Sequence, residues 1–206
     1  MEEYLVAEKN AQSEFVEKKS RFITFVSCVE NAEQAEKFIK QMRDRYPDAR
    51  HVCYAYRTYA PFCEKCSDDG EPKGTAGRPM LGVLQKAQVY DICVVVVRYF
   101  GGILLGANAL GRAYVRGCAD GVAAAGASMK KPAVRFDIVL PYHLYDLFLL
   151  RASAFEVRFE RRDFVQAAHI SLLLPKRQRA KFEEMLCRLS AGGAEIRITE
   201  GIHACF

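Results

Sequence analysis

The chain has 206 residues, of which 50% are hydrophobic and 27% are charged, and it contains 14 Gly and 7 Pro. This composition excludes a disordered, collagen-like or coiled-coil protein, and a chain of this size can bury a core without disulfides or metals. The 30 Lys and Arg residues exceed the 25 Asp and Glu residues by 5, a mild excess that does not by itself indicate a nucleic-acid partner.

Neither a signal peptide nor a membrane span is expected. The N-terminal Met1-Glu2-Glu3 lacks the basic flank and apolar run of a signal peptide. The most apolar strand-like run, 92–97, has six residues and is too short to cross a bilayer. We therefore expect a cytoplasmic protein without a membrane partner, in which the 8 cysteines are reduced.

Strand-like and helix-like patterns alternate over the first 130 residues. β-Branched and aromatic residues mark the strands, and apolar residues three and four positions apart mark the helices, the first of which has Asn31 as its N-cap. The run 92–97 is apolar on both faces, which predicts a central strand. The expected elements are strands 4–9, 14–18 and 21–29, a helix from Asn31 to Pro47, strand 51–59, a long loop 60–78, a helix from Pro79 to about Gln88, strand 91–99 and helix 107–125.

A second pattern begins after Lys130-Lys131-Pro132, which predicts two domains, 1–131 and 132–206. The order strand, helix, strand, strand, helix, strand is typical of the ferredoxin-like unit. We therefore expect an α+β chain. The elements expected in this half are strand 133–140, helix 142–152, strands 155–161 and 167–174, a helix 176–190 capped by Gly192-Gly193, and strand 194–205.

Basic residues and glycines gather in the same part of the chain. Between Pro72 and Arg116 six basic residues face one acidic residue, Asp91, and 11 of the 14 Gly lie between Gly70 and Gly126. Glycine lets a backbone approach a ligand closely, and the planar guanidinium of Arg suits phosphate. This enrichment predicts a nucleic-acid or anion-binding face formed by Lys73, Gly74, Gly77, Arg78, Arg98, Gly101, Gly102 and Arg112.

Two glycine-rich turns carry this prediction. Residues 67–80 run into a helix start, whose free N–H groups favour an anion. The alternative there is a structural turn in which Asp68 or Asp69 caps backbone groups. The second turn follows Arg98, and its neighbours Tyr99 and Phe100 could stack on an unpaired base, although we expect Phe100 in the core.

The carboxylates Asp68, Asp69 and Glu71 allow a different interpretation. Clustered acids can hold Mg²⁺, which would make the protein a metal-dependent enzyme acting on a phosphorylated small molecule or nucleotide. More often such acids are caps or partners of a nearby Arg, and a fully internal network would favour a protein-interaction module. The leading hypothesis assigns no catalytic residue, cofactor or metal. The set His51, Cys53, Cys63 and Cys66 is an unusual arrangement for zinc.

Three collinear segments, 67–72, 74–81 and 96–102, resemble the signature of the IMPACT family, bacterial YigZ type, and 51–56 resembles the strand that precedes it. The resemblance implies an N-terminal domain similar to domain IV of elongation factor G and a ferredoxin-like C-terminal domain similar to its domain V. It also implies a role in translation regulation through RNA or ribosome binding, without an established catalytic activity. Asn108 and Ala109 replace two glycines of the family pattern, and Cys63 and Cys66 lie outside it.

The leading hypothesis is therefore a cytoplasmic, translation-associated regulatory protein that binds RNA or a ribonucleoprotein through its Gly/Arg-rich face. A protein partner and the metal-dependent enzyme remain the alternatives.

Overall fold

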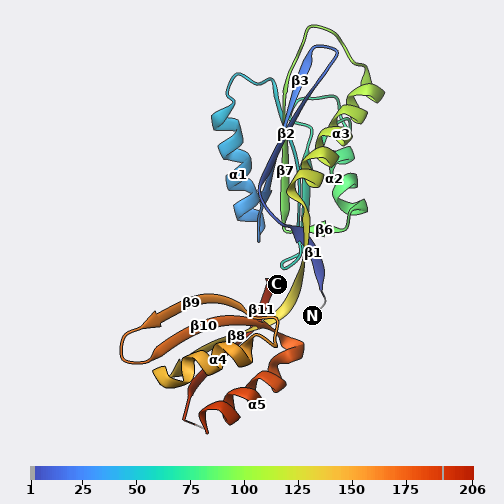
Figure 1. The fold of residues 1–206 in the computed structure, drawn as a ribbon. Helices are drawn as coiled ribbons and strands as arrows, with labels where there is room; N and C mark the ends of the chain where they lie inside the picture. Colours follow the sequence, from blue (N-terminus) through green and yellow to red (C-terminus); the bar gives the residue numbers. More distant parts are fainter. Residues whose placement is uncertain (1–2, 192) are drawn as a thin grey trace. The chain divides into compact units, whose positions relative to one another are not determined.

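The computed structural model describes residues 3–191 and 193–206 (Figure 1). The chain divides into two compact units, one formed by residues 4–128 and the other by residue 3 together with 129–206. No helix in the described part of the chain combines the length and apolarity needed to cross a membrane.

The unit of residues 4–128 is a three-layer α/β/α arrangement. Its five-stranded sheet has the order β2-β3-β7-β4-β5, and every neighbouring pair is antiparallel. Helix α1 covers one face, and α2 and α3 cover the other (Figure 1). The bounds are β2 Ala11–Glu17, β3 Ser20–Cys28, α1 Ala32–Arg45, β4 His51–Thr58, β5 Cys63–Ser67, α2 Gly77–Lys86, β7 Ile92–Tyr99 and α3 Ala107–Ala125, with a parallel pair β1 Tyr4–Ala7 and β6 Val89–Tyr90 beside them.

Strand β7 lies at the centre of the sheet, as its uniform apolarity predicts. Val94 and Val96 pack into the core beneath α2 and α3, whereas Val95 and Val97 pack into the core beneath α1. Period-two alternation thus places one continuous apolar run in two cores at once. The Asn31 cap is also confirmed, because its side chain accepts a hydrogen bond of 2.9 Å from the N–H of Gln34.

The prediction of an unbroken loop over 60–78 is wrong. Residues Cys63–Ser67 form β5, an edge strand paired with β4. Its side chains are mostly half-buried, so the segment lacks the continuous apolar or β-branched pattern that indicates a strand from sequence. Helix α2 begins at Gly77, two residues before the predicted start at Pro79, because the loop supplies its own helix cap, described below.

The second unit has the predicted order strand, helix, strand, strand, helix, strand. The sheet order β11-β8-β10-β9 is antiparallel throughout, with α4 and α5 on one face (Figure 1). Strand β8 begins at Ala127, six residues before the predicted start. Helix α5 is followed by its C-cap residue Ala191, which has φ 49, and Gly192 of the expected cap lies outside the described residues. The bounds are β8 Ala127–Leu140, α4 Tyr145–Ala152, β9 Arg158–Phe164, β10 Ala168–Pro175, α5 Arg179–Ser190 and β11 Glu195–Cys205, with short 3₁₀ turns before both helices.

Candidate anion-binding face

The loop before α2 is held by its own carboxylate, Asp68. One oxygen, Oδ1, accepts hydrogen bonds from the N–H groups of Ala76 (2.9 Å) and Gly77 (2.8 Å), and Oδ2 accepts one from Gly74 (2.7 Å). Partial burial raises the pKa of Asp68, but these three backbone donors outweigh it and hold the pKa below its ordinary value. The prediction of free N–H groups for an external anion is therefore wrong, and the capping alternative is correct.

Asp69 ties the same loop to two other elements. Its Oδ2 accepts a hydrogen bond of 2.8 Å from the backbone N–H of Val52 in β4, and its Oδ1 accepts one of 2.6 Å from Arg43 in α1. The residue has φ 40, an unusual value for a residue other than Gly. The loop conformation is thus fixed by contacts from both sides.

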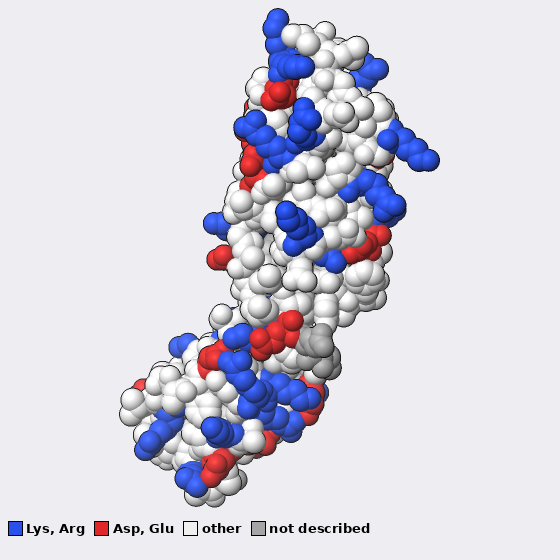
Figure 2. Space-filling view, turned by 90° about the vertical axis from the view of Figure 1, so that its right-hand side faces the viewer, with Lys and Arg blue, Asp and Glu red and all other residues white. Residues whose placement is uncertain are grey.

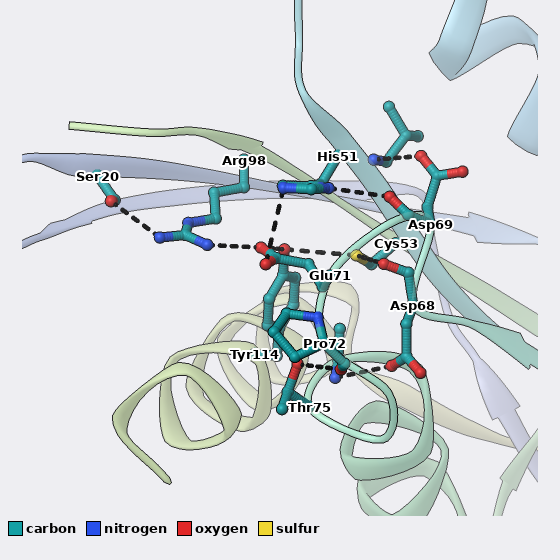
Figure 3. A network of polar contacts seen from close by, with 12 residues as sticks. Ser20, His51, Cys53, Asp68, Asp69, Glu71, Pro72, Thr75, Arg98 and Tyr114 are labelled. Carbon is teal, nitrogen blue, oxygen red and sulfur yellow. Dashed lines mark hydrogen bonds and ion pairs between the residues drawn. The ribbon is translucent and has the colours of Figure 1, made fainter. Parts of the chain in front are cut away.

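Glu71 is the centre of a buried network (Figure 3). Its Oε1 lies 2.6 Å from Arg98 Nη1 and 2.8 Å from the hydroxyl of Tyr114, and its Oε2 lies 3.7 Å from His51 Nε2. The side chains of Glu71 and Arg98 are only 3% and 7% exposed. His51 Nδ1 donates to the Asp69 carbonyl at 2.9 Å. Burial, together with the nearby negative groups, raises the pKa of the Tyr114 phenol, so this hydroxyl remains a donor.

Arg98 is therefore not part of an exposed face, contrary to the prediction. Its second terminal nitrogen donates to Ser20 Oγ at 3.3 Å, and its guanidinium lies over the rings of Phe22 and Phe100. A buried guanidinium needs a counter-ion, and Glu71 supplies one. The internal Arg–carboxylate pairing that the sequence offered as an alternative is the arrangement found.

Two of the predicted site glycines contact the protein's own backbone. A Cβ atom on Gly77 would lie 2.7 Å from Ser67, and one on Gly101 would lie 2.0 Å from the carbonyl carbon of Lys19. Packing therefore requires glycine at both positions, and their contact with a ligand stays a prediction. Gly74 and Gly102, with φ +78 and +82, face open space, so they stay available at the surface.

Three of the predicted cations remain at the surface: Lys73, Arg78 and Arg112. Within residues 3–191 and 193–206 none of the three has an ion-pair partner. Arg112 and Gly74 line one groove of about 640 Å³ between the loop before α2 and helix α3. Figure 2 shows Lys and Arg side chains spread over the side of this unit that carries α2 and α3, with fewer Asp and Glu side chains among them.

Sequence reasoning named Gly74 and Arg112 but not the other residues that line this groove, among them Asn108 and Arg116. Asn108 and Arg116 line it beside Arg112, because positions four apart on α3 share one helix face. Their spacing of four was a visible signal, but Asn108 was interpreted only as a departure from the family pattern. Arg116 also lies over the Phe15 ring at 4.4 Å and near Asp120 at 3.6 Å, so its charge is partly shared within the protein.

The three signature carboxylates do not converge. Asp68, Asp69 and Glu71 bind a helix start, a strand N–H and a buried Arg, respectively. Among the residues that the structure describes, no group of three or more His, Cys, Asp or Glu side chains could hold a metal ion. Cys53 donates to the Asp68 carbonyl at 3.0 Å, and burial raises the pKa of its thiol, which keeps it protonated.

The family model of the Impact N-terminal domain matches residues 18–122, which include this loop and strands β3, β4, β5 and β7 of the sheet. The chain belongs to the IMPACT family. The IMPACT family member of Haemophilus influenzae is 35% identical over 203 residues, which covers 97% of this chain and 98% of that protein. The IMPACT family member YigZ of Escherichia coli is 34% identical over 186 residues, covering 89% and 91%.

Two further comparisons mark the extent of this likeness. A solved structure described as a crystal structure of a hypothetical protein has 33% identity and a TM-score of 0.64, covering 98% of this chain and 100% of that one. Protein IMPACT of Danio rerio is 36% identical over 96 residues, which covers 44% of this chain and only 30% of that protein. The vertebrate likeness is thus confined to part of each chain.

Proposed function

We propose that this protein binds RNA or a ribonucleoprotein through the face around Lys73, Arg78 and Arg112, and that it acts as a translation-associated regulator in the cytoplasm. One observation carries the proposal: the acids of the signature loop contact the protein's own groups, whereas Lys73, Arg78 and Arg112 are exposed and have no ion-pair partner within residues 3–191 and 193–206. The face is therefore locally positive although the whole chain has a net charge of only +5. Exposed, unpaired Lys and Arg side chains bind phosphate with little competition from the protein.

The architecture supports the proposal by analogy. The family resemblance implies that the first unit is similar to domain IV of elongation factor G and the second to domain V. The strand order β11-β8-β10-β9 of the second unit is that of a ferredoxin-like domain, which agrees with this similarity. Fold analogy alone does not define a function, so the proposal depends on the charged face.

Fluorescence anisotropy with a labelled single-stranded RNA tests the proposal. The double variant Arg78→Ala/Arg112→Ala should bind at least about tenfold more weakly, and its salt dependence should fall by about 1.4 in log–log slope, from 0.7 for each lost phosphate contact. The matched control is Lys37→Ala/Lys40→Ala, which removes the same charge from exposed positions on α1, on the opposite face of the sheet. Equal losses in both variants would show non-specific attraction and overturn the assignment of this face.

A further inference from the structure

One end of the unit of residues 4–128 exposes apolar side chains that the proposed face does not use. The loop between β7 and α3 carries Phe100, Ile103 and Leu104, which are 41%, 42% and 83% exposed. The expectation that Phe100 lies in the core is therefore wrong. Neighbouring exposed apolar side chains on a loop are a feature of interaction surfaces.

The turn between β2 and β3 adds two positive charges at the same end. It is a two-residue loop, Lys18-Lys19, with φ 44 and 63. Turns with two positive φ values favour Asn and Gly, and a Lys at either position is strained. Two exposed lysines occupy the turn in spite of that preference, and they place two positive charges at this end of the sheet.

The turn and the loop are joined into one feature. Gly101 sits directly on the backbone of Lys19, and its N–H donates to Ser20 Oγ at 3.3 Å. Arg98 donates a second hydrogen bond to the same oxygen. We call residues 18–19 and 100–104 the tip; in Figure 1 both segments lie at the end of the sheet away from β6. These contacts hold the turn and the start of the loop together before any partner binds, which reduces the cost of ordering the backbone at Gly101.

The tip continues into the groove of the proposed face. Its loop leads into α3 at Ala107, and Asn108 and Arg112 on the first turns of α3 line that groove. Leu104 precedes the first residue of α3 by only three positions, so a partner that extends from the groove past the N-terminus of α3 would approach it. This partner must present both negative charge, for the lysines and Arg112, and flat apolar surface, for Ile103 and Leu104.

Single-stranded RNA meets both requirements, since each nucleotide carries a phosphate and an unpaired base with an apolar face. A perfect duplex offers the phosphates but stacks its bases inside. We infer that the tip contacts unpaired bases of an RNA whose backbone lies along the Lys73, Arg78 and Arg112 face. This inference rests on the proposed function and adds a preference for unpaired over paired RNA.

The test compares one RNA sequence, fluorescently labelled, as a single strand and as a perfect duplex. Ile103→Ser/Leu104→Ser should weaken single-strand binding at least about fivefold, as expected for lost base contacts, with an unchanged salt slope and unchanged duplex affinity. Phe62→Ser is the control; Phe62 is 64% exposed and lies between β4 and β5, at the opposite end of the sheet. Circular dichroism verifies that the variants fold.

Each outcome separates the two proposals. If the wild-type protein binds neither RNA, the proposed function is wrong and this inference is overturned with it. If Arg78→Ala/Arg112→Ala weakens binding but the tip variant binds both RNAs like the wild type, only the inference is overturned. Binding of the wild type, but not of the tip variant, to anionic phosphatidylserine vesicles together with unchanged RNA affinity would assign the tip to a lipid surface instead.

Discussion

The ion pair between Glu71 and Arg98 predicts a large and strongly non-additive effect on stability. Glu71→Gln leaves the 93%-buried guanidinium without its counter-ion, and this should lower the free energy of unfolding by about 3–5 kcal/mol. Arg98→Met leaves the carboxylate uncompensated and should cost a similar amount. In Glu71→Gln/Arg98→Met neither position of this pair carries a charge, and the Gln oxygen can still accept from Tyr114. The double variant should therefore be more stable than either single variant.

Urea unfolding followed by far-ultraviolet circular dichroism measures these differences, since the chain has no Trp for fluorescence. The control is Glu184→Gln, which breaks an exposed pair with Arg188 on α5 and should cost less than about 0.5 kcal/mol. A cost below about 1 kcal/mol for Glu71→Gln, or a double variant that costs the sum of the two single variants, would refute the reasoning.

Three other features give predictions of their own. The pKa of Asp68 lies below its ordinary value in the folded state, so the stability that this carboxylate contributes is complete above the unfolded pKa and is lost as the pH falls through the folded pKa. Asp68→Ala should therefore lower the free energy of unfolding by about 2–4 kcal/mol at neutral pH and make this free energy less dependent on pH in acid. Gly101→Ala should lower the melting temperature by several degrees, because its Cβ would meet the backbone of Lys19, whereas an unchanged melting curve would contradict the packing described. Cys187 is exposed and should react with a thiol reagent in the native protein. Cys93 is fully buried, and because burial also raises the pKa of its thiol, it should react only after unfolding. Mass spectrometry of the labelled peptides measures both reactions.

Much of the fold is visible in the sequence where one local rule dominates. The apolar run of β7, the small-residue periodicity of α3 and the Asn31 cap each define an element without reference to distant residues. The edge strand β5 cannot be recognised in this way, because its half-buried residues carry no strong local pattern and only its pairing with β4 defines it. For such segments, tertiary contacts determine whether a strand forms.

The candidate site was harder to predict for the same reason. Composition identified a Gly/Arg-rich segment, but it could not distinguish inward from outward charges. The side on which Arg98 lies depends on Glu71, 27 residues earlier in the chain, and on the register that places His51 opposite Arg98. Asp68 presents the same difficulty, since a carboxylate that caps a helix and one that holds a metal look alike in sequence.

The inward direction of the signature carboxylates has a consequence for how this family is interpreted. A sequence match at these acids indicates that the loop adopts this fold, and it gives no information on what the surface binds. Lys73, Arg78 and Arg112 are exposed and have no ion-pair partner in the described part of the chain, so exchanging them should cost little stability. Under the proposed function, two relatives that share every buried acid can therefore differ in what they bind, and a comparison restricted to these three positions would distinguish them.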